Sequence, residues 1–192
     1  AKINLTRESA SAKFHLELDL NIPSDGITAL FGSSGSGKTS LLRCIAGLEE
    51  NAIATIRFKN DLWQSHDHFL PTHERRIGLV FQRQNLFPHL SSRENIEFAE
   101  KRVKSSFDNL NVDSVINNLE IEHLLNKYPV QMSGGEQQLV ALARTLKSNP
   151  ALLLMDEPLS SLDDPRKNRL LEIIKDLNKE QGLPILYVTH SV

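Results

Sequence analysis

One short segment constrains this chain more than any other, the glycine-rich loop GSSGSGKT at residues 32–39. It matches the phosphate-binding pattern G-x-x-x-x-G-K-[ST], and it lies between the apolar run ITALF and the helical segment KTSLLRCIAGL. Glycines let the backbone wrap around phosphate oxygens, and the free N–H groups of the helix start point at them. The segment therefore predicts a triphosphate site rather than a chance glycine turn. The predicted nucleotide-binding residues are Gly32, Ser33, Ser34, Gly35, Ser36, Gly37, Lys38, Thr39 and Ser40.

Two side chains of this loop have specific expected roles. The Lys38 ammonium supplies positive charge to the β- and γ-phosphates, and the Thr39 hydroxyl is the expected ligand of Mg²⁺. A nucleoside triphosphate and Mg²⁺ are therefore expected at this loop.

The pattern of strands and helices predicts an α/β fold. Residues 13–22 alternate apolar and polar side chains, which is typical of a half-buried antiparallel strand near a sheet edge. Further predicted strands are ITALF, AIATIRFKNDLW, IGLVF, ALLLM and ILYVT, and the helix RKNRLLEIIKDLNKE is expected to start just after Pro165. Alternation of strands and helices predicts a mainly parallel sheet core with an antiparallel β edge. Together with the phosphate loop, this pattern predicts the fold of a P-loop NTPase.

The middle of the chain has a different pattern. From residue 91 to 127 the segments ENIEFAEKRV, VDSVINNLEI and EHLLNKY have helical spacing and many polar faces. We therefore expect a single domain over residues 1–192, with a catalytic core at 1–85 and 150–192. An α-helical subdomain of about residues 86–149 is inserted between two strands of the main sheet.

Composition adds few limits. The 192 residues suffice for one well-cored domain. The net charge is −2, so composition gives no indication of a nucleic-acid partner. The single cysteine, Cys44, excludes an internal disulfide, and no apolar run approaches membrane-spanning length.

An acidic pair follows a buried strand in ALLLMDEP. Asp156 and Glu157 are expected at the carboxyl end of that strand, where ligands collect in open α/β sheets. Asp156 is a candidate Mg²⁺ ligand, and Glu157 is a candidate base for an attacking water. The alternative is a solvated acidic loop, which the phosphate loop in the same chain makes the weaker interpretation.

A second potential anion site lies in QMSGGEQQLVALARTL, at residues 131–146. A polar turn and a glycine pair lead directly into an apolar helix, so the free N–H groups of its first turn point at whatever lies in front.

Together these residues resemble a known family, the nucleotide-binding subunits of ATP-binding cassette (ABC) transporters. The resemblance covers nearly the whole chain and depends on six motifs in order. They are the phosphate loop at 32–39, Gln82 of VFQ, MSGGE at 132–136, MDE with Asp156 and Glu157, SSLD at 160–163, and His190 of VTH.

The resemblance implies a head-to-tail homodimer. In it, ATP lies between the phosphate loop of one copy and the MSGGE motif of the other, which is called the signature of the family. ATP binding in trans would involve Ser133, Gly134, Gly135 and Glu136. Gln82 would reach both Mg²⁺ and the attacking water, and His190 would contact the γ-phosphate. Asp163 would couple the two sites. The implied catalytic residues are Glu157, His190 and Gln82, and the implied metal ligands are Thr39, Gln82 and Asp156.

The resemblance also implies partners and a location. Such subunits hydrolyse ATP at the cytoplasmic face of the cell membrane, bound peripherally to integral permease subunits and serving a solute-binding protein indirectly. The segment LFPHLSSRENIEF resembles the loop and helix on which importer permeases rest. The alternative interpretation is that this segment is buried within the helical subdomain. Linking segments such as LPTHERRIGLVFQ are most similar to those of molybdate importers, with sulfate, ferric iron and polyamine importers as alternatives.

Some positions depart from the family pattern. Leu139 stands where many members have arginine, and no aromatic residue precedes the first predicted strand to stack on adenine. Phe14 is the nearest candidate, although its alternation predicts a strand core residue. The sequence ends two residues after His190, from which we expect a truncated domain.

Two other function classes share some of these motifs. A chromosome-maintenance ATPase would place a long coiled coil between Gln82 and Ser133, and this segment contains no sustained heptads. A subunit that does not hydrolyse ATP is disfavoured by the presence of Lys38, Asp156, Glu157 and His190 in one chain.

Overall fold

The computed structural model describes residues 1–9, 12–82, 85–100, 116–117, 119–160 and 162–190. Its strands are β1 (Lys2–Ser9), β2 (Ala12–Asp19), β3 (Ile27–Phe31), β4 (Ile53–Phe58), β5 (Asp61–Gln64), β6 (Ile77–Val80), β7 (Leu152–Asp156) and β8 (Ile185–Thr189). Its helices are α1 (Lys38–Ile45), α2 (Ser92–Glu100), α4 (Gly134–Lys147) and α5 (Asp164–Gln181), with 3₁₀ helices η1 (Glu122–Leu124) and η2 (Pro129–Gln131). None of the helices in these ranges combines the length and apolarity that a bilayer crossing requires.

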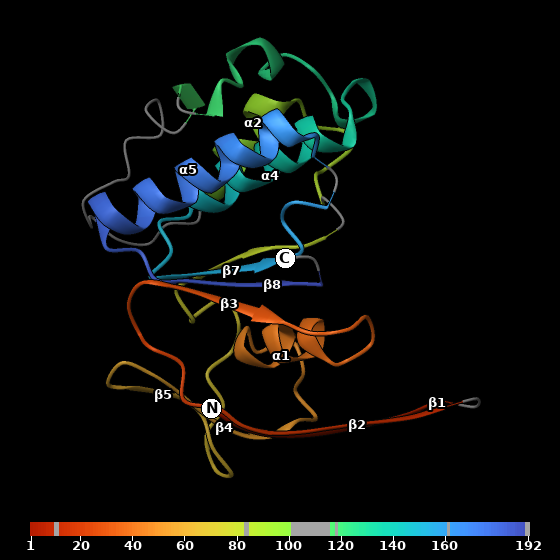
Figure 1. Cartoon of the computed structure of the whole chain (residues 1–192), viewed down its shortest axis with the longest axis vertical. Helices are drawn as coiled ribbons and strands as arrows, with labels where there is room; N and C mark the ends of the chain where they lie inside the picture. The colour runs from red at the N-terminus through yellow and green to blue at the C-terminus, as the bar shows by residue number, and fades with distance from the viewer. Residues whose placement is uncertain (10–11, 83–84, 101–115, 118, 161, 191–192) are drawn as a thin grey trace.

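The elements form successive layers (Figure 1). Helices α2, α4 and α5 lie on one side of the sheet that contains β3, β7 and β8, and α1 lies on the other side, between this sheet and β1, β2 and β4. One apolar core includes Leu142, Leu146 and Leu170 from the α4 and α5 layer. A second core includes Leu42 of α1 and Leu5 of β1. Helix α1 is thus enclosed between two sheets.

The central sheet is parallel, with the order β3-β8-β7-β6. Its strands are buried on both faces, because Leu153 and Met155 of β7 belong to the core beneath the helices while Leu152 and Leu154 belong to the core around α1. This two-sided burial explains why ALLLM is continuously apolar and does not alternate. The predicted parallel core is confirmed.

The second sheet is antiparallel, with the order β2-β1-β4-β5. The strand predicted at residues 13–22 is β2, and it lies at the sheet edge as expected. Its partner β1 was not predicted, although the buried Ile3 and Leu5 alternate with exposed neighbours. The run AIATIRFKNDLW is a hairpin of two strands, and Lys59 between them has a φ of 52°.

The helix boundaries differ from the predictions in two places. Helix α5 begins at Asp164 and not after Pro165, because proline is tolerated in a first turn and the Asp163 side chain caps the helix by accepting a hydrogen bond from Arg166 N. In EHLLNKY only the short 3₁₀ helix η1 forms. Residues 101–103 of ENIEFAEKRV and residues 112–115 and 118 of VDSVINNLEI lie outside the described residues.

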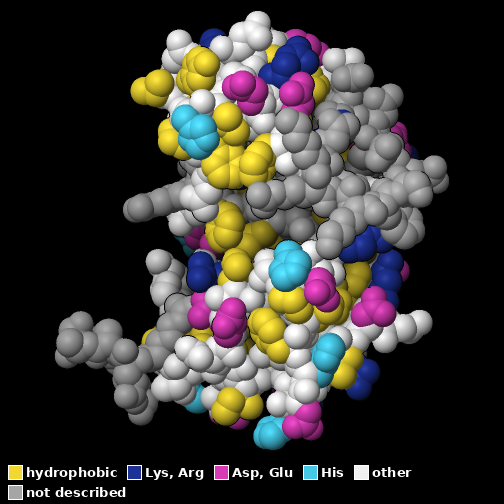
Figure 2. Space-filling model, turned by 180° about the vertical axis from the view of Figure 1, so that it is seen from behind, with side chains coloured by type: hydrophobic (Ala, Val, Ile, Leu, Met, Phe, Trp, Pro, Cys, Tyr) yellow, Lys and Arg dark blue, Asp and Glu magenta, His cyan; other side chains and the backbone are white. Residues whose placement is uncertain are grey.

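On the face seen in Figure 2, charged side chains of both signs are interspersed with apolar ones. The described part of this face therefore presents no extended field of a single sign.

Arg75 connects the end of α1 to the β5–β6 connection. It is only 3% exposed. Its guanidinium donates to the helix-end carbonyls of Cys44 (3.1 Å) and Ile45 (2.7 Å) and to Leu70 O (2.7 Å). Burial lowers the pKa of Arg75. A Cβ on Gly47, whose φ is 74°, would lie 2.7 Å from the Arg75 guanidinium carbon, so this contact requires glycine.

We predict that Arg75→Met lowers the free energy of unfolding by about 3 kcal/mol, because methionine fills part of the space but leaves buried carbonyls without donors. Chemical denaturation of the full-length protein measures the change. The matched control is Arg76→Met at the exposed neighbouring residue, for which we expect a change within about 0.5 kcal/mol. Equal effects of the two substitutions would contradict the structural role of Arg75.

Candidate active site

All four strands of the parallel sheet deliver a predicted site residue at their carboxyl ends. The phosphate loop follows β3, Gln82 follows β6, Glu157 follows β7 and His190 follows β8. Because parallel strands run in one direction, these ends meet at one edge of the sheet. The structure therefore brings together residues that are up to 158 positions apart in the sequence (from Gly32 to His190).

The phosphate loop forms a tight turn at the start of α1. Gly35 and Gly37 have φ angles of 79° and 96°, in the left-handed region that glycine adopts without strain. A Cβ on Gly37 would lie 2.7 Å from a methyl carbon of Leu16 and 3.3 Å from the ring of Phe14, so the loop packs directly on β2. The Lys38 ammonium donates to Gly32 O (2.7 Å) and Ser33 O (2.9 Å), which holds it inside the loop.

The acidic pair occupies two different environments. Asp156 is 5% exposed and accepts a 3.1 Å hydrogen bond from the Thr39 hydroxyl, which joins the two predicted metal ligands. Burial raises the pKa of Asp156, while the Thr39 hydrogen bond opposes that shift. Glu157 turns away from the strand with a φ of 49°, a conformation that few residues other than glycine adopt. Strain of this kind is concentrated at functional sites.

The Glu157 carboxylate is held from both sides. Gln82 Nε2 donates to its Oε2 at 3.3 Å, and His190 Nδ1 lies 2.7 Å from its Oε1. A carboxylate only accepts, so Nδ1 of His190 is the donor in this contact. The three residues that the resemblance implies to be catalytic therefore form one hydrogen-bonded group.

A cavity of about 440 Å³ opens beside this group. Phe14 of β2 forms part of its wall and also packs partly buried on the second core. The sequence made Phe14 the nearest candidate to stack on adenine but favoured a core role, because alternation shows which face of a strand is apolar but not which loop lies against it. The cavity is lined by Phe14, Ser34, Gly35, Gly37, Lys38, Thr39, Ser40, Gln82, Glu157 and His190.

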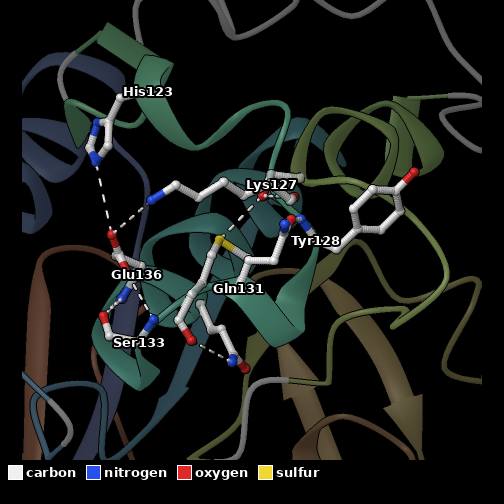
Figure 3. Close-up of polar contacts among 9 residues, drawn as sticks. His123, Lys127, Tyr128, Gln131, Ser133 and Glu136 are labelled. Atoms are coloured by element: carbon white, nitrogen blue, oxygen red, sulfur yellow. Dashed lines mark hydrogen bonds and ion pairs between the residues drawn. The ribbon is translucent and has the colours of Figure 1, made fainter.

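The signature residues lie elsewhere, at the start of α4. Ser133 caps this helix: its hydroxyl accepts a hydrogen bond from Glu136 N (3.3 Å), and the Glu136 carboxylate accepts one from Ser133 N (2.7 Å) (Figure 3). Ser133 and Gly134 are exposed and Gly135 is buried. Among the described residues that line the 440 Å³ cavity, none comes from this turn.

The remaining predicted residues have clear structural positions. Asp163 caps α5 and its carboxylate also lies 3.5 Å from Arg166 Nη1. In the segment predicted to face a permease, the buried Asn95 accepts from Phe87 N (2.9 Å) and donates to Leu90 O (3.1 Å). Pro88 is exposed while Phe87 and Leu90 are half-buried, so this loop has features of both alternatives.

The family model described as ABC transporter matches residues 16–160 of this chain. The chain belongs to the ABC transporter family. A dimeric structure of the ATP-binding cassette MJ0796 in a post-hydrolysis state, bound to ADP and Pi, has a TM-score of 0.83 and 30% sequence identity to this cassette, covering 99% of this chain and 86% of the other.

Two curated relatives are more similar in sequence. The molybdenum import ATP-binding protein ModC of Thiobacillus denitrificans is 50% identical over 178 residues, covering 93% of this chain and 49% of the relative. ModC of Saccharophagus degradans is 50% identical over 190 residues, covering 99% and 52%. This chain thus spans about half the length of the curated relatives it matches.

Because burial opposes ionisation of Asp156, its neutral form contributes stability that is fully present below the ordinary pKa of 3.8. This contribution is lost as the pH rises through the higher pKa of the folded state. We predict that Asp156→Asn stabilises the nucleotide-free, full-length protein by roughly 1 kcal/mol at pH 7, with a gain that shrinks toward pH 4. Chemical denaturation across this pH range measures the effect, and the exposed Asp176→Asn is the control. A gain that does not depend on pH would contradict this explanation.

Proposed function

We propose that the full-length protein is the ATP-binding subunit of an ABC importer and hydrolyses ATP with Mg²⁺. The observation that carries the proposal is the position of Glu157, which Gln82 and His190 hold in the wall of a cavity that the phosphate loop also lines. A carboxylate held beside a triphosphate-binding loop is suited to orient and deprotonate an attacking water.

The residues present fit both cofactors. Loop glycines with positive φ, a lysine inside the loop and a helix start together suit a polyphosphate. Oxygen donors are the ligands that Mg²⁺ prefers, and the Thr39 hydroxyl and Asp156 carboxylate are already joined at 3.1 Å. Bound Mg²⁺ would offset the cost of burying the Asp156 charge and would neutralise charge on the phosphates.

The chain's own residues divide the chemistry. Lys38 stabilises negative charge on the terminal phosphates, which its place inside the loop allows. Glu157 takes a proton from water, His190 keeps the carboxylate oriented through Oε1, and Gln82 does so through Oε2. Gln82 would also reach Mg²⁺. Phe14 in the cavity wall offers an aromatic surface for the adenine.

A second copy of the chain would complete each site. Within the described part of the chain, no residue of the signature turn lines the cavity, and the exposed start of α4 suits an anion that comes from outside. In a head-to-tail dimer Ser133, Gly134, Gly135 and Glu136 would face the partner's triphosphate, and Asp163 would couple the two sites. The dimeric cassette structures of MJ0796 support a homodimer.

Molybdate is the proposed transported solute, since the 50% identical relatives are named as molybdenum import proteins. The subunit would act peripherally at the cytoplasmic face of the membrane, on integral permease subunits that receive solute from a binding protein. We also propose a single domain with a catalytic core at residues 1–85 and 150–192 and a helical subdomain at about residues 86–149.

We predict that Glu157→Gln in the full-length protein preserves ATP binding, lowers hydrolysis at least about a hundredfold and accumulates an ATP-bound dimer. Glutamine keeps the side-chain shape but cannot accept the proton. Phosphate release and size-exclusion chromatography with ATP are the measurements. Glu180→Gln, at an exposed residue of α5, is the control and should behave like the parent protein. Unchanged turnover in Glu157→Gln would remove this residue from the proposed role.

Mixing two inactive variants tests the shared site. Lys38→Ala damages the phosphate loop and Ser133→Arg blocks the signature, so each pure dimer has two defective sites. A mixed dimer has one site built from an intact loop and an intact signature. We predict that an equimolar mixture recovers up to about a quarter of the parent activity, because half of random pairs are mixed and each has one of two sites. No recovery above the separate variants would argue against sites shared between copies.

A further inference from the structure

The signature turn carries a negative charge at the place where the proposed function requires it to receive an anion. Glu136 lies in the first turn of α4, and its side chain is only 17% exposed. Hydrogen bonds from the Ser133 backbone and then from its side chain lower the pKa of Glu136. An ionised carboxylate suits a helix start in a free subunit, but it repels a triphosphate that approaches the same turn.

Two basic side chains face this carboxylate from the segment that precedes the signature (Figure 3). Glu136 Oε2 accepts from Ser133 N at 2.7 Å, while its Oε1 lies 3.7 Å from Lys127 Nζ and 4.0 Å from His123 Nε2. Histidine is charged only when protonated, so Lys127 is the permanent cation of the two. Arg166 at the start of α5 also acts electrostatically on Glu136.

The backbone that carries Lys127 is fixed to both neighbouring helices. Lys127 O accepts from Ser92 N (2.8 Å) and from the Ser92 hydroxyl (3.0 Å) at the start of α2. From α4, Gln137 Nε2 donates to Pro129 O (2.9 Å) and Met132 O (3.2 Å). These hydrogen bonds fix the backbone segment that carries Lys127. The position of the lysine therefore does not depend on its ion pair with Glu136 alone.

We propose that Lys127 is a positioning residue of the signature turn, which neutralises Glu136 and keeps its carboxylate on Ser133. The turn then offers N–H groups without an uncompensated negative charge to the triphosphate held by a second copy. This inference deepens the proposed function and rests on it. Because the Lys127 side chain is 40% exposed, solvent screens this ion pair, which therefore contributes little to the stability of the free subunit. Its effect is expected when the dimer interface excludes water and strengthens charge interactions.

The test measures ATP-dependent dimerisation of the full-length protein in a Glu157→Gln background, by light scattering against ATP concentration. Lys127→Met should raise the ATP concentration for half-maximal dimerisation roughly three- to tenfold, with a smaller effect at high salt. Lys127→Arg should restore the parent value. In a Glu136→Gln background, Lys127→Met should cause no further shift relative to Glu136→Gln alone. Lys175→Met, which removes an exposed charge on α5, is the matched control.

The outcomes separate this inference from the proposed function. If the parent shows no ATP-dependent dimer, the proposed function fails and the inference fails with it. If the parent dimerises but Lys127→Met behaves like Lys175→Met, only the inference is overturned. A shift by Lys127→Met that is equally large with and without the Glu136→Gln substitution would also overturn it, because Lys127 would then act without the carboxylate.

Discussion

The common direction of four strands determines where the chemistry can occur. Neighbouring strands lie about 4.8 Å apart, so the first residues beyond their ends are within side-chain reach of each other. Strand β7 lies between β8 and β6, and Glu157 at its end is accordingly flanked by His190 and Gln82. The sheet order, rather than any local sequence feature, therefore assembles the three residues around one carboxylate.

The same arrangement requires the phosphate loop to keep a fixed position relative to this edge. Helix α1 is held at its start by the contact of Gly37 with β2 and at its end by Arg75, which binds the last carbonyls. Between these contacts Thr39 reaches Asp156 across the sheet edge. Rigid support of this kind matters because a buried, unneutralised carboxylate destabilises the fold. Asp156 thus lowers the stability of the fold, and the contacts that hold α1 in place compensate for this loss.

Much of the fold could be predicted because its strands are either fully buried or cleanly alternating. The parallel strands appear as continuous apolar runs, and β2 shows its edge position through its polar side. β1 was missed although it alternates, and the β4–β5 turn was missed because Lys59 adopts a positive φ without a glycine signal. The backbone strain at Glu157 and the exposure of Phe14 to the cavity depend on tertiary contacts, which no local pattern contains.

The two helix starts that suit anions are built differently, and the difference matches their proposed uses. The start of α1 has no acidic residue in its first turn, and Lys38 lies within its loop. The start of α4 has a complete capping box in which Ser133 and Glu136 satisfy each other's backbone N–H groups. An exposed helix end without such a cap would depend on water or a ligand for its hydrogen bonds. Under the proposed head-to-tail arrangement, the signature turn must remain folded each time two copies separate, and an internal cap provides that stability without a partner. This cap also places the negative charge of Glu136 next to the incoming phosphate. The proposed role of Lys127, whose backbone is fixed by hydrogen bonds, is to neutralise that charge.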